Sequence, residues 1–271
     1  MNLAIKVMFL LVTLSVSLKV FAHGDSSKAH YLGNEGVMIE VGGEKILFDP
    51  FFHNSYGHYT LVPTDIRQAI FENKTPYNNI KAIFISHAHE DHFDKDDMMK
   101  YLLTNKSVSL VAPAQAVTML KGLAGFEKIK DRVFPVNLEK GQAAQNLSVD
   151  KLGIEAVRIP HAGWPSRAEV ENIVFRVSVN QEVVVMHMGD ADPNPSHFNE
   201  HKSFWPKLQT DIAFPPYWFS LSPTGQRILN NVINAKKSVG VHVPTNVPPL
   251  LKSSGADYFS KPGETREIKT D

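Results

Sequence analysis

Alternation between hydrophobic and polar residues near the start of the chain predicts a β-hairpin. Residues 36–41 alternate in this way, and residues 45–49 return with a similar pattern after Gly42 and Gly43. Two glycines suit a two-residue hairpin turn, because both turn positions need a positive φ. A longer apolar run at residues 80–86 predicts a buried strand.

The rest of the chain alternates between short apolar runs, which predict strands, and longer amphipathic stretches, which predict helices. Strands are expected at residues 108–112, 153–159, 173–179, 182–188, 211–214 and 238–242. Helices are expected at residues 94–103, where Asp94 is a suitable N-cap, at 113–123, after Ser196, and at 224–235. Two sheets packed face to face, with helices on the outside, satisfy this order of elements.

The first 22 residues predict an export signal. Lys6 precedes a largely apolar run at residues 7–18, and Ala22 offers a small residue at the cleavage point. The run has about 12 residues, which is short of the ~20 that a membrane-spanning helix needs. No repeat or Gly/Ser linker divides the remaining chain. We therefore expect residues 23–271 to form one exported domain, periplasmic or secreted, without a transmembrane segment.

The charge and the cysteine content exclude several classes of partner and site. The 271 residues carry 28 basic and 28 acidic side chains, so the chain has no basic field for binding nucleic acid. It has no cysteine, which excludes both a disulfide framework and thiolate metal ligands. The 12 histidines are the unusual feature, and their placement carries the functional prediction.

Potential metal ligands gather directly after the apolar run at residues 80–86. The segment His87-Ala88-His89-Glu90-Asp91-His92 places four of them, His87, His89, Asp91 and His92, within six residues. The spacing of two lets His87 and His89 converge on one metal, while Asp91 and His92 are placed to reach a second. Imidazole and carboxylate donors suit zinc, manganese or iron. The segment therefore predicts a metal centre, with a solvated polar loop as the alternative.

This segment is similar to the His-x-His-x-Asp-His signature of the metallo-β-lactamase-fold hydrolase superfamily. The resemblance asks for three later ligands just after strands, and His161, Asp190 and His242 stand at such places. It implies an α+β fold, a four-layer αβ/βα sandwich of two mixed β-sheets packed face to face with helices outside. In the implied site, His87, His89 and His161 hold one metal, Asp91, His92 and His242 hold another, and Asp190 bridges them.

The resemblance also implies a dinuclear hydrolase that uses a metal-bridging hydroxide on an ester-type bond. Asp91 would be the catalytic residue that orients the hydroxide. The expected cofactors are two divalent metal ions, with Zn²⁺ as the default and Mn²⁺ or Fe as alternatives. Two cations that share a water lower its pKa and stabilise developing negative charge, so no serine or cysteine nucleophile is required.

Each later residue of this set also has an alternative reading that involves no metal. His161 could be an isolated loop histidine, and His242 could be a core histidine at a strand end. Asp190 could be a turn residue, with Asp192 as a rival ligand two positions away. His187 is predicted as a hydrogen-bonded core histidine, with a supporting role at the site as the alternative.

Three aromatic-rich stretches offer two interpretations. They lie at residues 51–59, 204–205 and 215–219, and they would form either an apolar rim around the metal site or ordinary core packing. Four further histidines lie in polar or aromatic loops and are predicted at the surface: His53, His58, His197 and His201.

The ligand set favours ester or phosphodiester hydrolysis over β-lactam hydrolysis. True β-lactamases of the superfamily lack a bridging aspartate and many use a cysteine ligand, whereas this chain has Asp190 and no cysteine. The strings at residues 48–50 and 85–94 resemble the branch that contains ascorbate-phosphate lactonases and the phospholipase D acting on N-acylphosphatidylethanolamine. A small-molecule or lipid-like substrate with a phosphodiester or lactone bond is therefore expected. A β-lactam-hydrolysing enzyme and a non-catalytic metal-binding protein are the alternatives.

Overall fold

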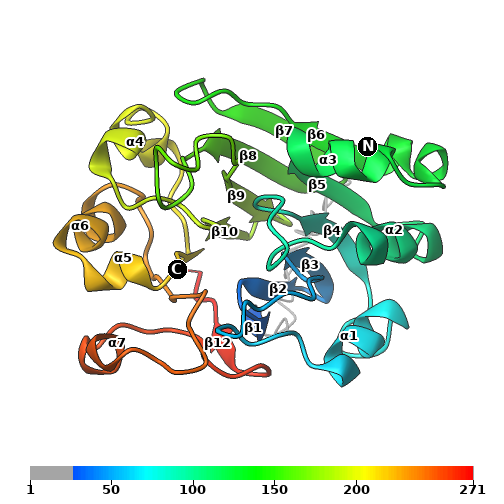
Figure 1. Ribbon diagram of the computed structural model, residues 1–271, viewed down its shortest axis with the longest axis horizontal. Helices are drawn as coiled ribbons and strands as arrows, with labels where there is room; N and C mark the ends of the chain where they lie inside the picture. Colours follow the sequence, from blue (N-terminus) through cyan, green and yellow to red (C-terminus); the bar gives the residue numbers. More distant parts are fainter. Residues whose placement is uncertain (1–26, 271) are drawn as a thin grey trace, which may run out of the picture.

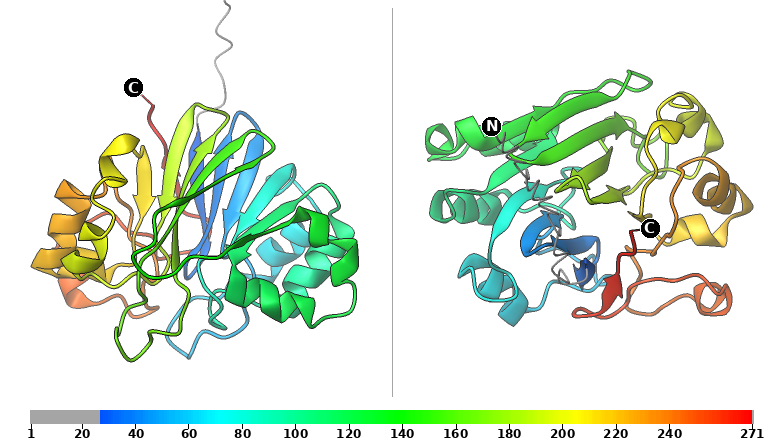
Figure 2. Two further views of the ribbon diagram at one scale, coloured as in Figure 1. Left: turned by 90° about the horizontal axis from the view of Figure 1, so that it is seen from above. Right: turned by 180° about the vertical axis from the view of Figure 1, so that it is seen from behind.

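The computed structural model describes residues 27–270, which fold into two facing β-sheets with helices on both outer sides (Figures 1 and 2). This is the α+β sandwich of two mixed sheets that the sequence predicts. The export signal predicted at residues 1–22 lies outside the described residues. Within them, no helix is both long enough and apolar enough to cross a membrane.

The first sheet combines an antiparallel half with a parallel half. Its strands are β1 (Lys28–Gly33), β2 (Gly36–Val41), β3 (Glu44–Phe48), β4 (Ile80–Phe84), β5 (Ser109–Pro113), β6 (Val133–Val136) and β12 (Thr265–Glu267). Their order is β12-β1-β2-β3-β4-β5-β6. Neighbours run antiparallel from β12 to β3 and parallel from β3 to β6.

The second sheet has the order β11-β10-β9-β8-β7. Its strands are β7 (Gln145–Val149), β8 (Leu152–Arg158), β9 (Ile173–Val179), β10 (Val183–His187) and β11 (Ile212–Phe214). Neighbouring strands are antiparallel except for the pair β10 and β11.

The helices form the outer layers, as the view from above shows (Figure 2). On the first sheet lie α1 (Thr64–Phe71), α2 (Lys95–Thr104) and α3 (Ala114–Lys121). On the second lie α4 (Pro195–Asn199), α5 (Trp218–Leu221) and α6 (Pro223–Asn231), and α7 (Pro249–Ser253) follows beside α5. Three short 3₁₀ helices lie at Phe126–Lys128, Lys130–Arg132 and Trp205–Lys207.

The centre of the core lies between the two sheets. Inward-facing residues such as Phe48 and Phe84 of the first sheet and Phe175 and Val177 of the second are fully buried there. Each such side chain contributes roughly 1.5–3 kcal/mol when it is removed from water. The sandwich is therefore a rigid base for loops that leave the ends of its strands.

Most of the elements that local patterns predict begin and end within one or two residues of the observed ones, and two expectations are wrong. The apolar stretch at residues 238–242 forms only isolated bridges, such as the one between Ala213 and Ser238. The helix expected at residues 224–235 ends at Asn231. Asn234 has a φ of 52°, which a continuing helix does not allow.

Candidate metal centre

All seven predicted ligands lie at one edge of the sandwich, in loops that follow strands of both sheets. The segment of residues 87–92 follows β4, His161 follows β8, and Asp190 follows β10. His242 follows Val241, which pairs with Pro216 beyond the end of β11. Residues distant in sequence therefore meet where the strands end, and their donor atoms form two neighbouring clusters.

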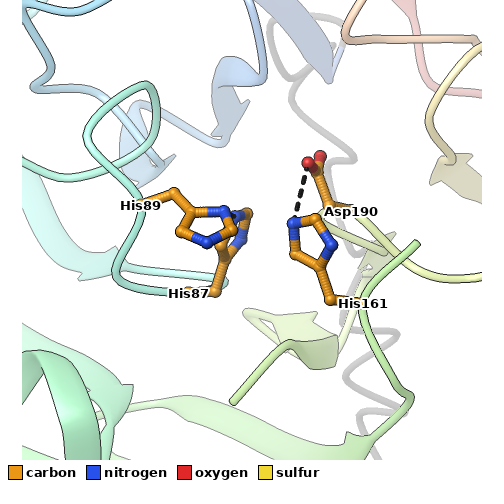
Figure 3. Close-up of side chains that lie close together, drawn as sticks. All are labelled: His87, His89, His161 and Asp190. Carbon is orange, nitrogen blue, oxygen red and sulfur yellow. Dashed lines mark hydrogen bonds and ion pairs between the residues drawn. The ribbon is translucent and has the colours of Figure 1, made fainter. Parts of the chain in front are cut away.

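The first cluster consists of His87, His89, His161 and Asp190, whose donor atoms all lie within 4.8 Å of one another (Figure 3). The Nε2 of His87 faces the Nδ1 of His89 at 3.0 Å. The Nε2 of His161 lies 3.1 Å from Oδ2 of Asp190. Three imidazoles and one carboxylate thus point toward a common centre.

The second cluster consists of Asp91, His92 and His242, and all three side chains are buried. Oδ2 of Asp91 lies 3.7 Å from Nε2 of His92 and 3.4 Å from Nε2 of His242. This cluster contains the remaining three of the seven predicted ligands.

Asp190 lies between the two clusters and faces both with different oxygens. Its Oδ2 faces His161, whereas its Oδ1 lies 3.4 Å from Nε2 of His92 and 3.2 Å from Nε2 of His242. Asp192, the rival considered from sequence, instead uses Oδ1 to accept a hydrogen bond from the backbone of Asn194. The geometry therefore selects Asp190 as the shared carboxylate.

Hydrogen bonds on the far side of the rings orient three of the histidines. Nδ1 of His92 pairs with Oδ2 of Asp49 at 2.9 Å, and Nδ1 of His161 donates to the carbonyl oxygen of Ala162 at 2.7 Å. Nδ1 of His87 contacts Oγ of Ser86 at 3.0 Å. Because each Nδ1 is occupied, the Nε2 lone pair is directed into the site, as in well-supported metal centres.

Asp49 is a supporting residue that the sequence analysis did not assign. It is fully buried, and it accepts hydrogen bonds from the backbone N of Ser86 at 2.8 Å and from the Ser86 hydroxyl at 2.5 Å. It thereby joins the end of β3 to the start of the ligand loop and fixes His92. The sequence signal that could have identified Asp49 is its position directly after the apolar end of β3, Ile46 to Phe48.

Asn172 and Gly189 hold the loops of the second sheet together. The buried Asn172 amide donates to the carbonyl oxygens of Ile159 and Met188, and its Oδ1 accepts from the backbone N of Asp190 at 2.9 Å. Gly189 has a φ of 50°, and a Cβ there would lie 2.4 Å from Oδ1 of Asn172. Only glycine fits this turn, which explains the Gly-Asp sequence before the shared carboxylate.

The turn between β1 and β2 also supports the metal centre, which the sequence did not predict. Its residues Asn34 and Glu35 are both fully buried, which is unusual for a hairpin turn. The Asn34 side chain donates to the backbone carbonyl oxygen of Asp91 at 3.0 Å, and the backbone carbonyl oxygen of Asn34 accepts from the backbone N of His242. Asn34 therefore ties the first ligand segment to the last ligand.

The donor set fits divalent metal ions. Several inward-facing atoms are buried and have no hydrogen-bond partner among the described residues, namely Nε2 of His92, His161 and His242 and Oδ1 of Asp190. Buried polar atoms almost always have a partner, so this group of buried nitrogen and oxygen atoms is suited to bind a metal ion. Imidazole and carboxylate donors directed at a common point are the chemistry of a zinc, manganese or iron site.

The electrostatics of the centre also suit cations. Desolvation lowers the pKa of His87 and His89, so both rings are neutral at pH 7, the form that coordinates a metal. Desolvation works against ionised Asp190, but His242 and His92 hold the pKa of its carboxyl well below the usual range. At His242 desolvation is outweighed, chiefly by Asp190, and the pKa rises to about 9. Carboxylates that hold a proton on His242 also attract a divalent cation.

A cavity of about 360 Å³ opens over the centre. Its wall contains His89, Asp91, Asp190 and His242 together with Tyr56, Tyr59, Arg167 and Glu169. Tyr59 contacts the His242 ring edge-on, with centroids 4.1 Å apart. The Arg167 side chain passes over Gly163 and forms no hydrogen bond or ion pair with other described residues. A free cation therefore lies beside the donors.

Some aromatic residues of the three stretches lie at the rim of the metal centre, and the others lie in the core. Tyr59 and Trp218 contact the His242 ring, and the Trp218 indole also donates to the carbonyl oxygen of Ala191. Most of the other aromatic side chains, such as Phe51 and Trp205, are buried in the core. The rim is thus formed by a few of these residues and the core by the rest.

The remaining histidines include two corrections. His53 and His58 are exposed, as predicted, whereas His197 and His201 are each only 3% exposed and are not surface residues. They pack beneath the loops around α4, where His197 contacts Trp164 and His201 contacts Trp205. His187 is a core histidine, as predicted, and its Nε2 lies 3.0 Å from the carbonyl oxygen of Glu35.

Comparisons with known proteins agree on the family and the fold. A family model described as a beta-lactamase superfamily domain matches residues 28–216, which is well over half of the chain. A UPF0173 metal-dependent hydrolase from Bacillus cereus is 26% identical over 239 residues, covering 86% of this chain and 92% of the relative.

Two solved structures illustrate the similarity of fold. The metallo hydrolase Igni18 from Ignicoccus hospitalis has a TM-score of 0.59 at 15% identity, covering 91% of this chain and all of the other. An isothiocyanate hydrolase from Delia radicum gut bacteria has a TM-score of 0.57 at 14% identity, covering 88% of this chain and 98% of the other.

Proposed function

The chain belongs to the beta-lactamase superfamily and is a metal-dependent hydrolase, and from this premise we propose that it uses two divalent metal ions to hydrolyse an ester-type bond. The bond is a phosphodiester or a lactone in a small-molecule or lipid-like substrate. The observation that carries this proposal is the position of Asp190, whose two oxygens face two separate sets of histidines.

Each cluster has a distinct part in this proposal. His87, His89 and His161 would hold the first ion, Asp91, His92 and His242 would hold the second, and Asp190 would serve both. Bound divalent ions lower the pKa of a water molecule and stabilise the negative charge that develops on the substrate. Asp91 borders the cavity, so its carboxylate would accept a hydrogen bond from a water molecule there and orient it.

Arg167 favours a substrate with a negative charge near the scissile bond. Its guanidinium group borders the same cavity as Asp190 and has no partner among residues 27–270. Guanidinium groups bind phosphate and carboxylate oxygens with good geometry. Tyr56 and Tyr59 add apolar surface and hydroxyl groups beside it. A phosphodiester, or a lactone that carries an anionic group, matches this lining.

Zinc as the bound metal and export of the chain remain parts of the proposal. Zinc is supported by a first cluster that contains three imidazoles. Export is supported by the pattern of residues 1–22, with a basic start, a short apolar run and a small residue at the cleavage point.

The test combines metal analysis with hydrolysis of four substrate types. The purified protein is expected to bind about two metal ions per chain and to hydrolyse a chromogenic phosphodiester or a lactone faster than a β-lactam or a simple uncharged ester. Removal of the metal with a chelator should abolish this activity, and added Zn²⁺ or Mn²⁺ should restore it. Full activity without metal would refute the mechanism, and rapid turnover of β-lactams alone would refute the substrate class.

Asp190→Ala is the decisive variant, and Asp192→Ala is its matched control. Loss of the shared carboxylate should lower kcat/KM by more than about 100-fold, beyond the range seen for residues that only support ligands. Asp192 lies two positions away and bonds to the backbone of its own turn, so its removal should leave metal content unchanged. Equal losses in both variants would contradict the assignment of Asp190.

A further inference from the structure

We propose that Glu35 is an additional metal ligand, which completes the binding site of the ion held by Asp91, His92 and His242. This inference rests on the two-metal site proposed above and extends it by one residue. It also assigns the two sites different metal preferences.

Glu35 is a buried carboxyl group without a hydrogen-bond partner. Its exposed fraction is 0%, and neither Oε1 nor Oε2 has a hydrogen-bond partner among the described residues. A buried carboxylate without a partner is strongly unfavourable, because desolvation of the charge is not compensated. Burial raises the pKa of Glu35, so its carboxyl group is either protonated or bound to a cation.

His187 does not fulfil this role. Its Nε2 lies 3.5 Å from Oε2 of Glu35, but the hydrogen bond of this ring nitrogen is formed with the backbone oxygen of Glu35 at 3.0 Å. The His187 ring also stacks on Phe48, with centroids 4.8 Å apart, which fixes its plane. The carboxylate of Glu35 is therefore left without a donor on that side.

On its other side Glu35 faces the metal centre. One of its oxygens lies within 4.8 Å of donor atoms of both His92 and Asp190, and all three residues are buried. Nε2 of His92 and Oδ1 of Asp190 also lack hydrogen-bond partners among the described residues. The carboxylate oxygens of Glu35 and Asp190 repel one another when both are charged. A cation bound between them would remove this repulsion and give all three residues a partner.

The backbone directs Glu35 to this position. Asn34, with a φ of 44°, and Glu35 form the turn between paired Gly33 and Gly36. A Cβ on Gly36 would lie 2.9 Å from the carbonyl oxygen of Gly33, so the turn is tight. The Asn34 side chain is anchored on the backbone of Asp91. Both turn residues thus point into the centre rather than into solvent.

With Glu35 included, the two sites differ in donor chemistry. The first has three imidazoles and the shared carboxylate of Asp190. The second has the imidazoles of His92 and His242 with the carboxylates of Asp91, Asp190 and Glu35. Carboxylate-rich sites suit Mn²⁺ or Fe²⁺, whereas imidazole-rich sites suit Zn²⁺. We therefore expect the second site to accept Mn²⁺ more readily than the first.

Glu35→Gln tests the assignment, because it removes the charge and keeps the size of the side chain. Metal-free protein is titrated with Mn²⁺ and with Zn²⁺, and binding is followed by calorimetry and by the Mn²⁺ paramagnetic resonance signal. The variant is expected to keep one Zn²⁺ site of wild-type affinity and to bind the second ion, especially Mn²⁺, more than about 100-fold more weakly. Glu40→Gln on β2 is the matched control, since Glu40 pairs with Lys45 at 3.0 Å, and it should bind both ions normally.

A second measurement separates a ligand from a purely structural residue. Replacing a buried carboxyl group that has no hydrogen-bond partner should leave the melting temperature of the metal-free protein unchanged or raise it, whereas loss of a structural contact would lower it. If the glutamine variant does not fold, Glu35→Asp replaces it, because aspartate keeps the charge but has a shorter side chain. This variant is expected to bind the second ion more weakly than the wild type. Two ions bound to either variant with wild-type affinity would overturn the assignment of Glu35. A wild-type protein that binds fewer than two ions would instead refute the two-metal proposal itself.

Discussion

The two donor clusters share Asp190 but are supported in different ways. In the first, His87 and His161 contact the neighbouring Ser86 hydroxyl and Ala162 carbonyl, so the support is local and uncharged. In the second, His92 pairs with the buried carboxylate of Asp49, and further carboxylates surround it. Negative charge is therefore concentrated at one cluster. The comparison suggests that the two clusters bind metal with different strength and preference, although one carboxylate belongs to both.

Two single variants, each lacking one ligand histidine, should have the largest effects. His161→Ala acts on the first cluster and His242→Ala on the second, and each should lower kcat/KM by more than about 100-fold. Metal analysis should find about one ion in each variant, with Mn²⁺ retained better by His161→Ala because the carboxylate-rich cluster remains intact. If both variants lose both ions, the clusters do not act as separate sites.

Asp49→Asn should produce a smaller effect that is larger at the second cluster, because Asp49 contacts His92 directly but reaches His87 only through the Ser86 hydroxyl. Asparagine keeps an acceptor near Nδ1 of His92 but loses the charge that supports the ring. We expect the affinity for one of two ions to fall by about 10–100-fold, as for other residues that orient a ligand histidine. Titration with a competing chelator measures each affinity. Equal weakening of both ions would show that Asp49 supports the whole centre rather than His92.

Arg167→Ala should have the smallest effect and should leave metal binding unchanged. Loss of one charged contact to an anionic substrate should raise KM by about tenfold, which corresponds to about 1.4 kcal/mol. An uncharged lactone should be hydrolysed as by the wild type. Arg227→Ala on α6 is the control, because Arg227 is also exposed but does not border the cavity. An equal loss with charged and uncharged substrates would contradict a role in anion binding.

The elements that could be predicted from sequence are those determined by local patterns. The Gly42-Gly43 turn and the strand Ile173–Val179 follow from turn chemistry and an apolar run, and the helix capped by Asp94 follows from its N-cap. The same kind of local pattern wrongly predicts a strand at residues 238–242. Its apolar residues are buried as in a strand, but its partners allow only single bridges.

The candidate ligands could also be predicted, because a residue type with distinctive chemistry follows each strand. The supporting residues could not. Each forms a hydrogen bond with a residue that is distant in the sequence. The separation is 57 positions for Asn34 and Asp91, 18 for Asn172 and Asp190, and 37 for Asp49 and Ser86. Each has a common polar side chain whose role depends on contacts that only the folded chain creates. The burial of His197 is of the same kind, since it follows from packing around α4.

The short strand β12 has a consequence for how the molecule behaves at high concentration. It pairs with residues Lys28 to His30 of β1 and occupies the edge of the longer sheet. Arg266 of this strand pairs with the Asp257 carboxylate at 2.9 Å, which holds the strand to the neighbouring loop. Three residues with polar side chains make a poor template for another chain, whereas six residues of bare β1 would make a good one. This small strand thus protects the protein against aggregation by intermolecular strand pairing.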